Sequence, residues 1–343
     1  MISSRFKSLA RWLRLLAGSV VAIAFITVGI AVWLWQDRPA LSELGWPVAE
    51  ATTEPANAVT VTWLGVTTLL FDDNETQILI DGWFTRPGIH HHLLGEISTD
   101  IANVNYAMAE FRINRLAAIV PVHSHFDHAM DVGIVANRST AVVLGSESTA
   151  NIARGANLPV EQYQILADGE TRQFGDFVIT LIVSRHAPIA DGMKPWFPGT
   201  ITEPLEQPAR TNEWKDGQSY SVLISHPRGK TLVQGSAGFI KGKLSDVSAD
   251  VVMLGVAGLS RLGQNYTAEY WRETVMAVDA DRIYPIHIED FTRPFGDVTL
   301  FPRVVDDATV AARWINDIAV TGKSFDDPPH IQRLPFGLSV VLY

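Results

Sequence analysis

The stretch Leu116-Ala-Ala-Ile-Val-Pro-Val-His-Ser-His-Phe-Asp-His128 decides the fold prediction. Its first seven residues, 116–122, are apolar without interruption, as in a strand that is buried on both faces of a sheet. Three histidines and one aspartate follow within six residues, where the strand runs into a loop. Alternate side chains of an extended segment point the same way, so His123 and His125 can face one point. Asp127 and His128 lie past the strand and can be directed at a second point.

This cluster has the chemistry of a metal site. Imidazole and carboxylate ligands suit zinc, iron or manganese. The chain contains no Cys, which excludes thiolate ligands, a Cys nucleophile and disulfides. A polar loop that is rich in histidine by chance is the alternative, but the density of ligands directly after a buried strand favours a metal site.

The segments on either side of the cluster predict two blocks of short strands, each accompanied by helices. Alternating β-branched and apolar residues, bounded by turn residues, indicate the strands. We expect strands at 59–64, 67–71, 77–81, 177–183, 220–224, 231–234 and 251–254, and helices at 101–113, 131–137, 148–156 and 265–278. Such a pattern predicts an α/β fold in which two sheets pack face to face with helices outside.

The histidine motif resembles that of the metallo-β-lactamase superfold, and the resemblance extends over about residues 57–343. Further matching landmarks are Trp63-Leu-Gly65, Asp81-Gly82, Ser184-Arg-His186 and Ile283-Tyr-Pro-Ile-His287. The resemblance implies a four-layer αβ/βα sandwich with metal ions in a groove at one edge of the sheets. Within the superfold, the chain is similar to the branch that holds N-acyl-phosphatidylethanolamine-hydrolysing phospholipase D and ascorbate-phosphate lactonase.

The resemblance also implies two sets of metal ligands. The first set is His123, His125 and His186, and the second is Asp127, His128 and His287. The expected cofactor is zinc, as one ion or two, with iron or manganese as alternatives. In Val233-Gln-Gly-Ser-Ala-Gly238, Ser236 stands where the family usually has a bridging aspartate. A serine hydroxyl cannot bridge two cations with negative charge, so a single metal, a weakly held second metal and a degenerate site all stay open.

The implied activity is hydrolysis by a metal-bound hydroxide, with Asp127 as the catalytic residue that orients it. We expect a small-molecule or lipid substrate, specifically a phosphodiester or lipid-like one. A lactonase, or another hydrolase of cyclic esters or amides, is the first alternative. A non-catalytic envelope binding protein with a degenerate metal site is the second, and Ser236 is the feature that favours it.

Three more residues are candidates for supporting the site or contacting substrate, together with Ser236. Asp81 ends a predicted strand and can hold a ligand imidazole in one tautomer, or simply cap a turn. His92 belongs to the run His90-His91-His92, in a loop that often overhangs the groove in this fold. Trp196 lies in a Pro-rich insertion after His186 that is well placed to form a lid. For the last two, an ordinary surface loop is the alternative.

The N-terminal segment predicts a membrane anchor. Residues 1–36 carry four cations and no acid, and residues 15–36 carry no charge. That stretch is long enough to cross a hydrocarbon core of about 30 Å. The charge bias predicts a single-pass protein of the bacterial inner membrane with its catalytic domain in the periplasm. A cleaved signal peptide is the alternative. We therefore expect a basic head and anchor at 1–36, a linker at 37–56 and a hydrolase domain at 57–343.

The charge of the chain argues against a general nucleic-acid-binding surface. The formal net charge is −10, and the part after residue 36 contains 23 Lys and Arg against 37 Asp and Glu. We expect the membrane, through the N-terminal helix, to be a partner, and nucleic acid not to be one.

Overall fold

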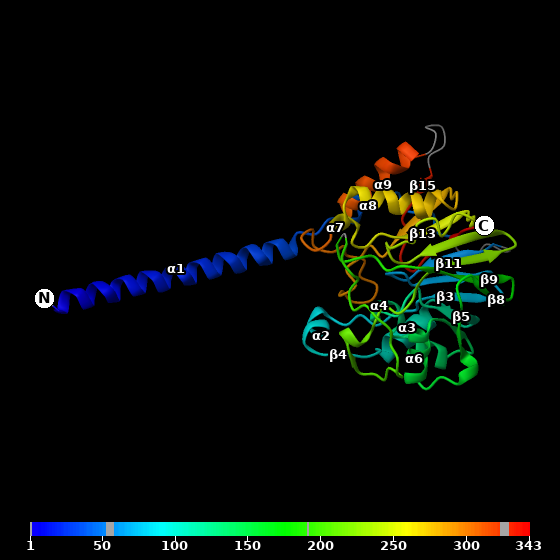
Figure 1. Ribbon diagram of the computed structural model, residues 1–343, viewed down its shortest axis with the longest axis horizontal. Helices are drawn as coiled ribbons and strands as arrows, with labels where there is room; N and C mark the ends of the chain where they lie inside the picture. The colour runs from blue at the N-terminus through cyan, green and yellow to red at the C-terminus, as the bar shows by residue number, and fades with distance from the viewer. Residues whose placement is uncertain (1, 53–57, 191, 323–328) are drawn as a thin grey trace.

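The computed structural model describes residues 2–52, 58–190, 192–322 and 329–343 (Figure 1). Two seven-stranded sheets lie face to face, with helices on the outer side of each. This arrangement confirms the αβ/βα sandwich that the sequence predicted.

The first sheet has the order β16-β1-β2-β3-β5-β6-β7. Its strands, in that order, are Ser339–Val341, Thr60–Trp63, Leu69–Asp72, Gln77–Ile80, Leu116–Val120, Val142–Gly145 and Tyr163–Ile165. Its helices are α3 (Ile101–Glu110), α4 (Phe126–Ala129), α5 (Val132–Asn137) and α6 (Glu147–Gly155). A two-stranded sheet pairs β4 (Glu96–Ile97) with β10 (Ala209–Arg210).

The second sheet has the order β15-β14-β13-β12-β11-β9-β8. Its strands, in that order, are His330–Ile331, Arg282–Ile286, Val251–Gly255, Gly229–Gln234, Ser219–His226, Phe177–Ser184 and Glu170–Phe174. Its helices are α7 (Leu259–Leu262), α8 (Gln264–Trp271) with the π-helical turn η4 (Arg272–Met276), and α9 (Ala308–Gly322). The other elements are α1 (Ile2–Gln36), α2 (Ile89–Leu94) and the 3₁₀ turns η1 (Leu41–Leu44), η2 (Val160–Gln162) and η3 (Thr211–Glu213).

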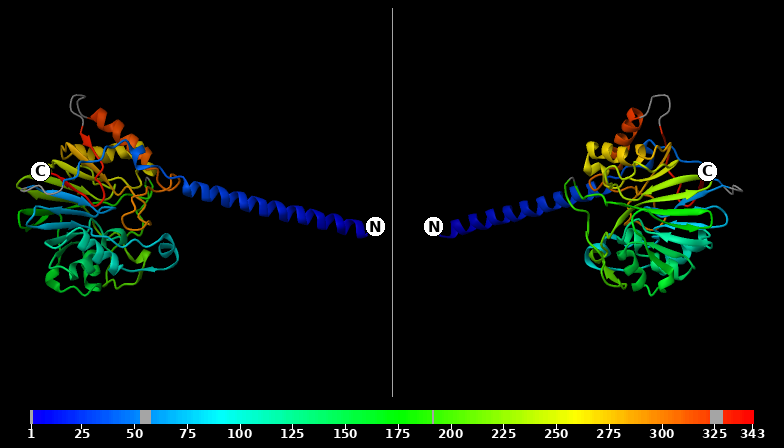
Figure 2. Two further views of the ribbon diagram at one scale, coloured as in Figure 1. Left: turned by 180° about the vertical axis from the view of Figure 1, so that it is seen from behind. Right: turned by 45° about the vertical axis from the view of Figure 1, so that its right-hand side comes forward.

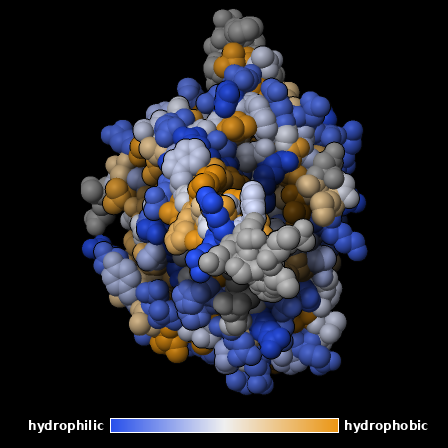
Figure 3. All heavy atoms as spheres, turned by 90° about the vertical axis from the view of Figure 1, so that its left-hand side faces the viewer, coloured by the Kyte–Doolittle hydropathy of each residue, from blue (hydrophilic) through white to orange (hydrophobic). Residues whose placement is uncertain are grey.

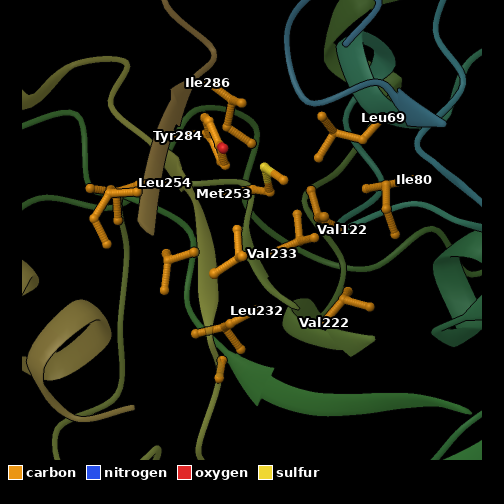
Figure 4. Close-up of a cluster of buried hydrophobic side chains, with 14 of the residues drawn as sticks. Leu69, Ile80, Val122, Val222, Leu232, Val233, Met253, Leu254, Tyr284 and Ile286 are labelled. Atoms are coloured by element: carbon orange, nitrogen blue, oxygen red, sulfur yellow. The ribbon is translucent and has the colours of Figure 1, made fainter. Parts of the chain in front are cut away.

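The core between the sheets explains the continuous apolar strands. Every residue of β13 is buried, and four of the five residues of β5 are buried, because each strand has a covered layer on both faces. Side chains of the two sheets meet in the middle (Figure 4). Those labelled there include Leu69, Ile80, Val122, Val222, Val233 and Met253. The strands β5 and β14 each end directly before predicted ligands, so this packing places those ligands at one edge of the sandwich.

The helix α1 extends away from the domain (Figures 1 and 2). Its part Arg11–Gln36 is long and apolar enough to span a membrane, and none of the tested apolar window is buried inside the protein. A signal sequence near an N-terminus has the same length and composition. The structure therefore shows one candidate membrane-spanning helix among the described residues.

The segment after α1 differs from the predicted linker over 37–56. Leu44 and Trp46 are buried in the core, and the Trp46 indole donates a hydrogen bond to Asn316 Oδ1 at 2.8 Å. Arg38 pairs with Asp290 at 2.7 Å. Residues 37–49 are thus part of the domain, whereas 53–57 lie outside the described residues. The acidic and Pro-rich composition of the segment concealed the two apolar side chains that attach it.

The Arg38–Asp290 pair gives a prediction for stability. The Asp290 side chain is 1% exposed, so Arg38→Ala leaves a buried carboxylate that accepts, among the described residues, from the backbone amide and the hydroxyl of Thr292. We expect the free energy of unfolding to fall by about 3 kcal/mol, measured by urea titration of the full chain in detergent. The control is Arg293→Ala, which breaks the exposed pair with Asp297 and should cost less than about 1 kcal/mol. Equal losses in the two variants would contradict the prediction.

Candidate metal centre

The structure brings the six predicted ligands together at one edge of the sandwich. His123 and His125 follow β5, and Asp127 and His128 lie on α4, which begins directly after them. His186 follows β9, and His287 follows β14. Five of the six side chains are at least nine-tenths buried by residue exposure, and His186 is half-buried.

The first set has its donor atoms turned toward one point. Candidate ligand atoms of His123, His125 and His186 all lie within 4.8 Å of one another, with His123 Nε2 3.0 Å from His125 Nδ1. His125 Nε2–H donates to the carbonyl of Trp196 at 2.9 Å, and His186 Nδ1–H donates to the carbonyl of Ala187 at 2.7 Å. A carbonyl only accepts, so these bonds place each proton on the outer nitrogen. The inner nitrogens keep their lone pairs, as a metal ligand requires.

The second set is arranged around a carboxylate. Asp127 Oδ2 lies 3.4 Å from His128 Nε2 and 3.4 Å from His287 Nε2. His128 Nδ1–H donates to Asp81 Oδ2 at 2.6 Å, which directs the Nε2 atom at Asp127. Buried nitrogens also lack partners within the described residues, namely the Nδ1 atoms of His123 and His287. The chemistry of the two sets fits one or two divalent cations.

Comparisons with known proteins agree with this architecture. A metallo hydrolase of the archaeon Ignicoccus hospitalis, Igni18, is 12% identical and has a TM-score of 0.50, over 83% of this chain and 99% of its own. CmlA, a diiron β-hydroxylase of Streptomyces venezuelae, is 15% identical with a TM-score of 0.51, over 85% of this chain and 55% of its own. The metallo-β-lactamase fold protein YhfI of Bacillus subtilis is 13% identical with a TM-score of 0.47. This chain has the same αβ/βα sandwich fold as Igni18 and CmlA.

At these identities the structural likeness shows the fold alone. No family model matches the sequence. One curated protein, the exodeoxyribonuclease YycJ of Bacillus anthracis, is 29% identical over 94 residues, which is 27% of this chain. The match spans about a third of that relative's length, 34%. One neighbour is thus a hydrolase and another a hydroxylase, so the reaction has to be argued from the side chains.

Burial sets the protonation of the histidines in the candidate metal centre. It lowers the pKa of His125 to about 4 and that of His186 to about 3, and it lowers the pKa of His123 as well. These three imidazoles are neutral at pH 7, which is the form that binds a metal. Burial also acts to lower the pKa of His128, but the carboxylates of Asp127 and Asp81 outweigh it and raise that pKa to about 10. A cation at the second set has to displace that proton.

These pKa shifts predict acid sensitivity of the metal-free chain. The pKa values of His125 and His186 are lowered by folding, so the unfolded chain binds more protons as the pH falls below about 6.5. The free energy of unfolding should then fall by roughly 1 kcal/mol per pH unit for each histidine between about pH 6.5 and pH 5. Over this range His128 is protonated in the folded chain and at least half protonated in the unfolded chain, so its raised pKa offsets only a small part of this loss. Urea titrations after chelation measure the slope. Because the pKa of His123 is lowered as well, His186→Gln should reduce the slope by about a third, and a flat profile would contradict the assignment.

Asp81 follows β3 directly and contacts both the backbone just before His123 and the side chain of His128. Its side chain is fully buried; Oδ1 accepts a hydrogen bond from Val122 N at 2.9 Å, and Oδ2 accepts from His128. Its φ of 58° lies in the left-handed region, where Asp is tolerated better than most residues. Of the two roles open for Asp81 in the sequence, holding an imidazole therefore matches its contacts.

Ser236 has a contact of its own beside the first set. Its Oγ accepts a hydrogen bond from Ala187 N at 2.9 Å and so fixes the turn that carries His186. The hydroxyl supports a ligand loop at the position where the family usually has a bridging carboxylate.

The two predicted substrate contacts, His92 and Trp196, differ from each other. His92 lies on the short helix α2; its Nε2–H donates to the carbonyl of Pro87 at 2.9 Å, and its ring lies 4.7 Å from that of Phe126. The Trp196 indole is 54% exposed, whereas its carbonyl oxygen receives the hydrogen bond of His125. The backbone of the Pro-rich insertion therefore belongs to the site, and the indole faces solvent.

Sequence reasoning missed a third acid near the site, Glu289. This buried carboxylate accepts a hydrogen bond from Val66 N, and the carbonyl of Val66 accepts one from His287 N at 2.9 Å. Glu289 thus braces the backbone of the loop that carries His287. The only signal in the sequence is its place two residues after that histidine, because its partner Val66 is 223 residues away.

Proposed function

We propose that this protein is a membrane-anchored, metal-dependent hydrolase that acts on a phosphodiester or a lipid-like ester. The observation that carries the proposal is the convergence of two three-residue donor sets, in the first of which His125 and His186 keep their inner lone pairs. Five histidines and one carboxylate buried in this arrangement are costly in a protein without a cation, because polar groups without partners are unfavourable in a core. The same groups are well suited to hold one or two divalent ions.

The bound cation or cations would supply an activated water and polarise the oxygen under attack. Asp127 lies between His128 and His287 and would accept a hydrogen bond from the attacking water, orienting it toward the substrate. Asp81 keeps His128 in the required tautomer. His125 and His186 have their outer nitrogens fixed by carbonyls, so they would act as ligands and not as proton acceptors.

We propose that α1 spans the bacterial inner membrane, with the metal-binding domain in the periplasm. Four cations precede the apolar stretch, which supports a cytoplasmic N-terminus. The contact of Arg38 with Asp290 argues against a cleavage that removes Arg38, because Asp290 would then be buried without its cation. Zinc is the favoured metal, with iron or manganese as alternatives.

The substrate class is supported by two associations. The branch resemblance implies phosphodiester or lactone substrates, and the partial relative is named an exodeoxyribonuclease, an enzyme of phosphodiester cleavage. The acidic charge of the chain supports a small or lipid-borne phosphodiester over DNA. A lactonase, or another hydrolase of cyclic esters or amides, remains the alternative enzyme, and a binding protein with a degenerate site is the alternative outside catalysis.

The proposal is tested by a substrate screen on the full chain in detergent, loaded with zinc, iron or manganese. The probes are bis(p-nitrophenyl) phosphate, a phospholipid, a lactone and a single-stranded DNA. We expect cleavage of a phosphodiester that stops on chelation and returns with metal, while His330→Ala, an exposed position in β15, leaves the rate unchanged. Bound metal without cleavage of any probe would contradict the hydrolase and favour the binding protein. Cleavage that survives complete chelation would contradict the metal mechanism.

A further inference from the structure

No free chain separates α1 from the domain. Asp37 N donates to the carbonyl of Trp33, which continues the helix, and the carbonyl of Asp37 accepts from Arg303 N at 2.8 Å. The next residue, Arg38, donates to Asp290 Oδ2 at 2.7 Å and to the carbonyl of Leu300 at 2.6 Å. The first two residues after the helix are therefore fixed on the domain, and a membrane that α1 spans must lie against this face.

This attachment is close to the metal centre. Asp290 is three residues after His287, so their Cα atoms are at most about 11 Å apart. The Asp290 side chain is 1% exposed, and Thr292 also donates to it through its amide and hydroxyl. The loop after β14 thus carries the predicted ligand His287 at one end and, at Asp290, the contact with Arg38 that attaches α1 to the domain.

A second segment, in the chain after β9, contacts the candidate metal centre. Residues 193–197 expose Met193 (58%) and Trp196 (54%), with the exposed Lys194 between them. The carbonyl of Trp196 holds His125. Tryptophan and lysine on an exposed segment are typical of the membrane–water interface. The side of the domain with α2, α4 and the chain after β9 is the side from which α1 leaves (Figures 1 and 2).

We propose that residues 193–197 lie in the headgroup region of the bilayer that α1 spans, so that the metal centre opens toward the membrane. The substrate would then be a lipid-borne ester held in the adjacent leaflet by its acyl chains. Hydrophobic and hydrophilic atoms are mixed beside α1 on the face that Figure 3 shows, with the helix pointing toward the viewer. This inference rests on the membrane-spanning role of α1 proposed above and deepens the choice of substrate.

Val160 provides a matched control position. Its side chain is 74% exposed, and it lies in η2, directly before β7. The strand β7 is parallel to β6, and β6 is parallel to β5. The start of β7 therefore lies at the end of the sheet opposite to the end of β5, where the ligands follow.

Because the chain contains no cysteine, a single introduced cysteine can be labelled selectively. Trp196→Cys and Val160→Cys are labelled with a nitroxide in the full chain, in nanodiscs of phosphatidylethanolamine and phosphatidylglycerol. Electron paramagnetic resonance then compares collisions with oxygen and with a water-soluble nickel complex. We expect the label at position 196 to lie within about 5–10 Å of the headgroups, with nickel collisions several-fold below those at position 160.

Each outcome has a separate meaning. Equal nickel collisions at the two positions would overturn the docking of residues 193–197 and leave the anchored hydrolase standing. An intact mass that lacks residues 1–36 after expression would overturn the anchor itself, and this inference with it. Met193→Ser should also slow the hydrolysis of a phospholipid in nanodiscs while leaving that of bis(p-nitrophenyl) phosphate unchanged; equal effects on the two would contradict the inference.

Discussion

Replacing His123 with alanine is expected to remove most of the bound metal and to lower hydrolysis at least about 100-fold. His123 lies 3.0 Å from His125 and also belongs to the cluster with Asp127 and His128, so its loss disturbs both donor sets. Removing a residue that merely orients a ligand costs about 10–100-fold in metal affinity or activity. The loss of a ligand should cost at least the upper end of that range.

Mass spectrometry of the metal content and the rate on the best substrate measure this effect together. His123 is 1% exposed, so the alanine variant leaves a cavity, and a thermal melt must show that the variant is folded. His330→Ala is the matched control at an exposed position, where metal content and rate should be unchanged. If a folded His123→Ala chain kept its metal and its rate, His123 would not be a ligand and the catalytic metal would be held elsewhere.

Replacing Asp81 with asparagine is expected to weaken the second donor set about 10–100-fold in metal affinity. Asparagine has the same shape and tolerates the φ of 58° at this position. Its amide oxygen can keep the bond from Val122 N, and its amide nitrogen then faces His128 Nδ1 as a donor. To avoid two facing donors, His128 has to keep its proton on Nε2, and that nitrogen then has no lone pair for a metal ion.

Titration against a chromophoric chelator measures the affinity of each ion. Asp131→Asn is the matched control, since Asp131 is a buried carboxylate that accepts from Phe84 N, Thr85 N and the Thr85 hydroxyl without touching a ligand. The control should lose stability and keep its metal affinity. Similar metal affinities in Asp81→Asn and the wild type would show that Asp81 only caps the end of β3.

The sequence predicted those features that have local signals. The apolar run 116–122 and the histidines that follow it are contiguous, so the end of β5 and the cluster on α4 could be read directly. His186 and His287 each follow a strand, and the family resemblance gave their register. The tertiary structure then brings all four segments to one edge.

Contacts between distant segments could not be predicted in the same way. Glu289 and Val66 are 223 residues apart, and Arg38 and Asp290 are 252 residues apart, with no pattern in either neighbourhood that names the partner. The predicted linker shows the same limit. Its composition is that of a loop, yet Leu44 and Trp46 are buried because α9 and the second sheet offer them a surface.

Metal content per chain, measured by mass spectrometry after reconstitution with zinc, iron or manganese, tests the central claim most directly. A soluble form for this purpose should begin at Asp37, so that Arg38 keeps its contact with Asp290. We expect one to two ions per chain that survive dialysis and are lost in His123→Ala; about one ion would indicate that Ser236 does not support the second. A folded chain that binds no ion after reconstitution would contradict the metal centre and the hydrolase built on it.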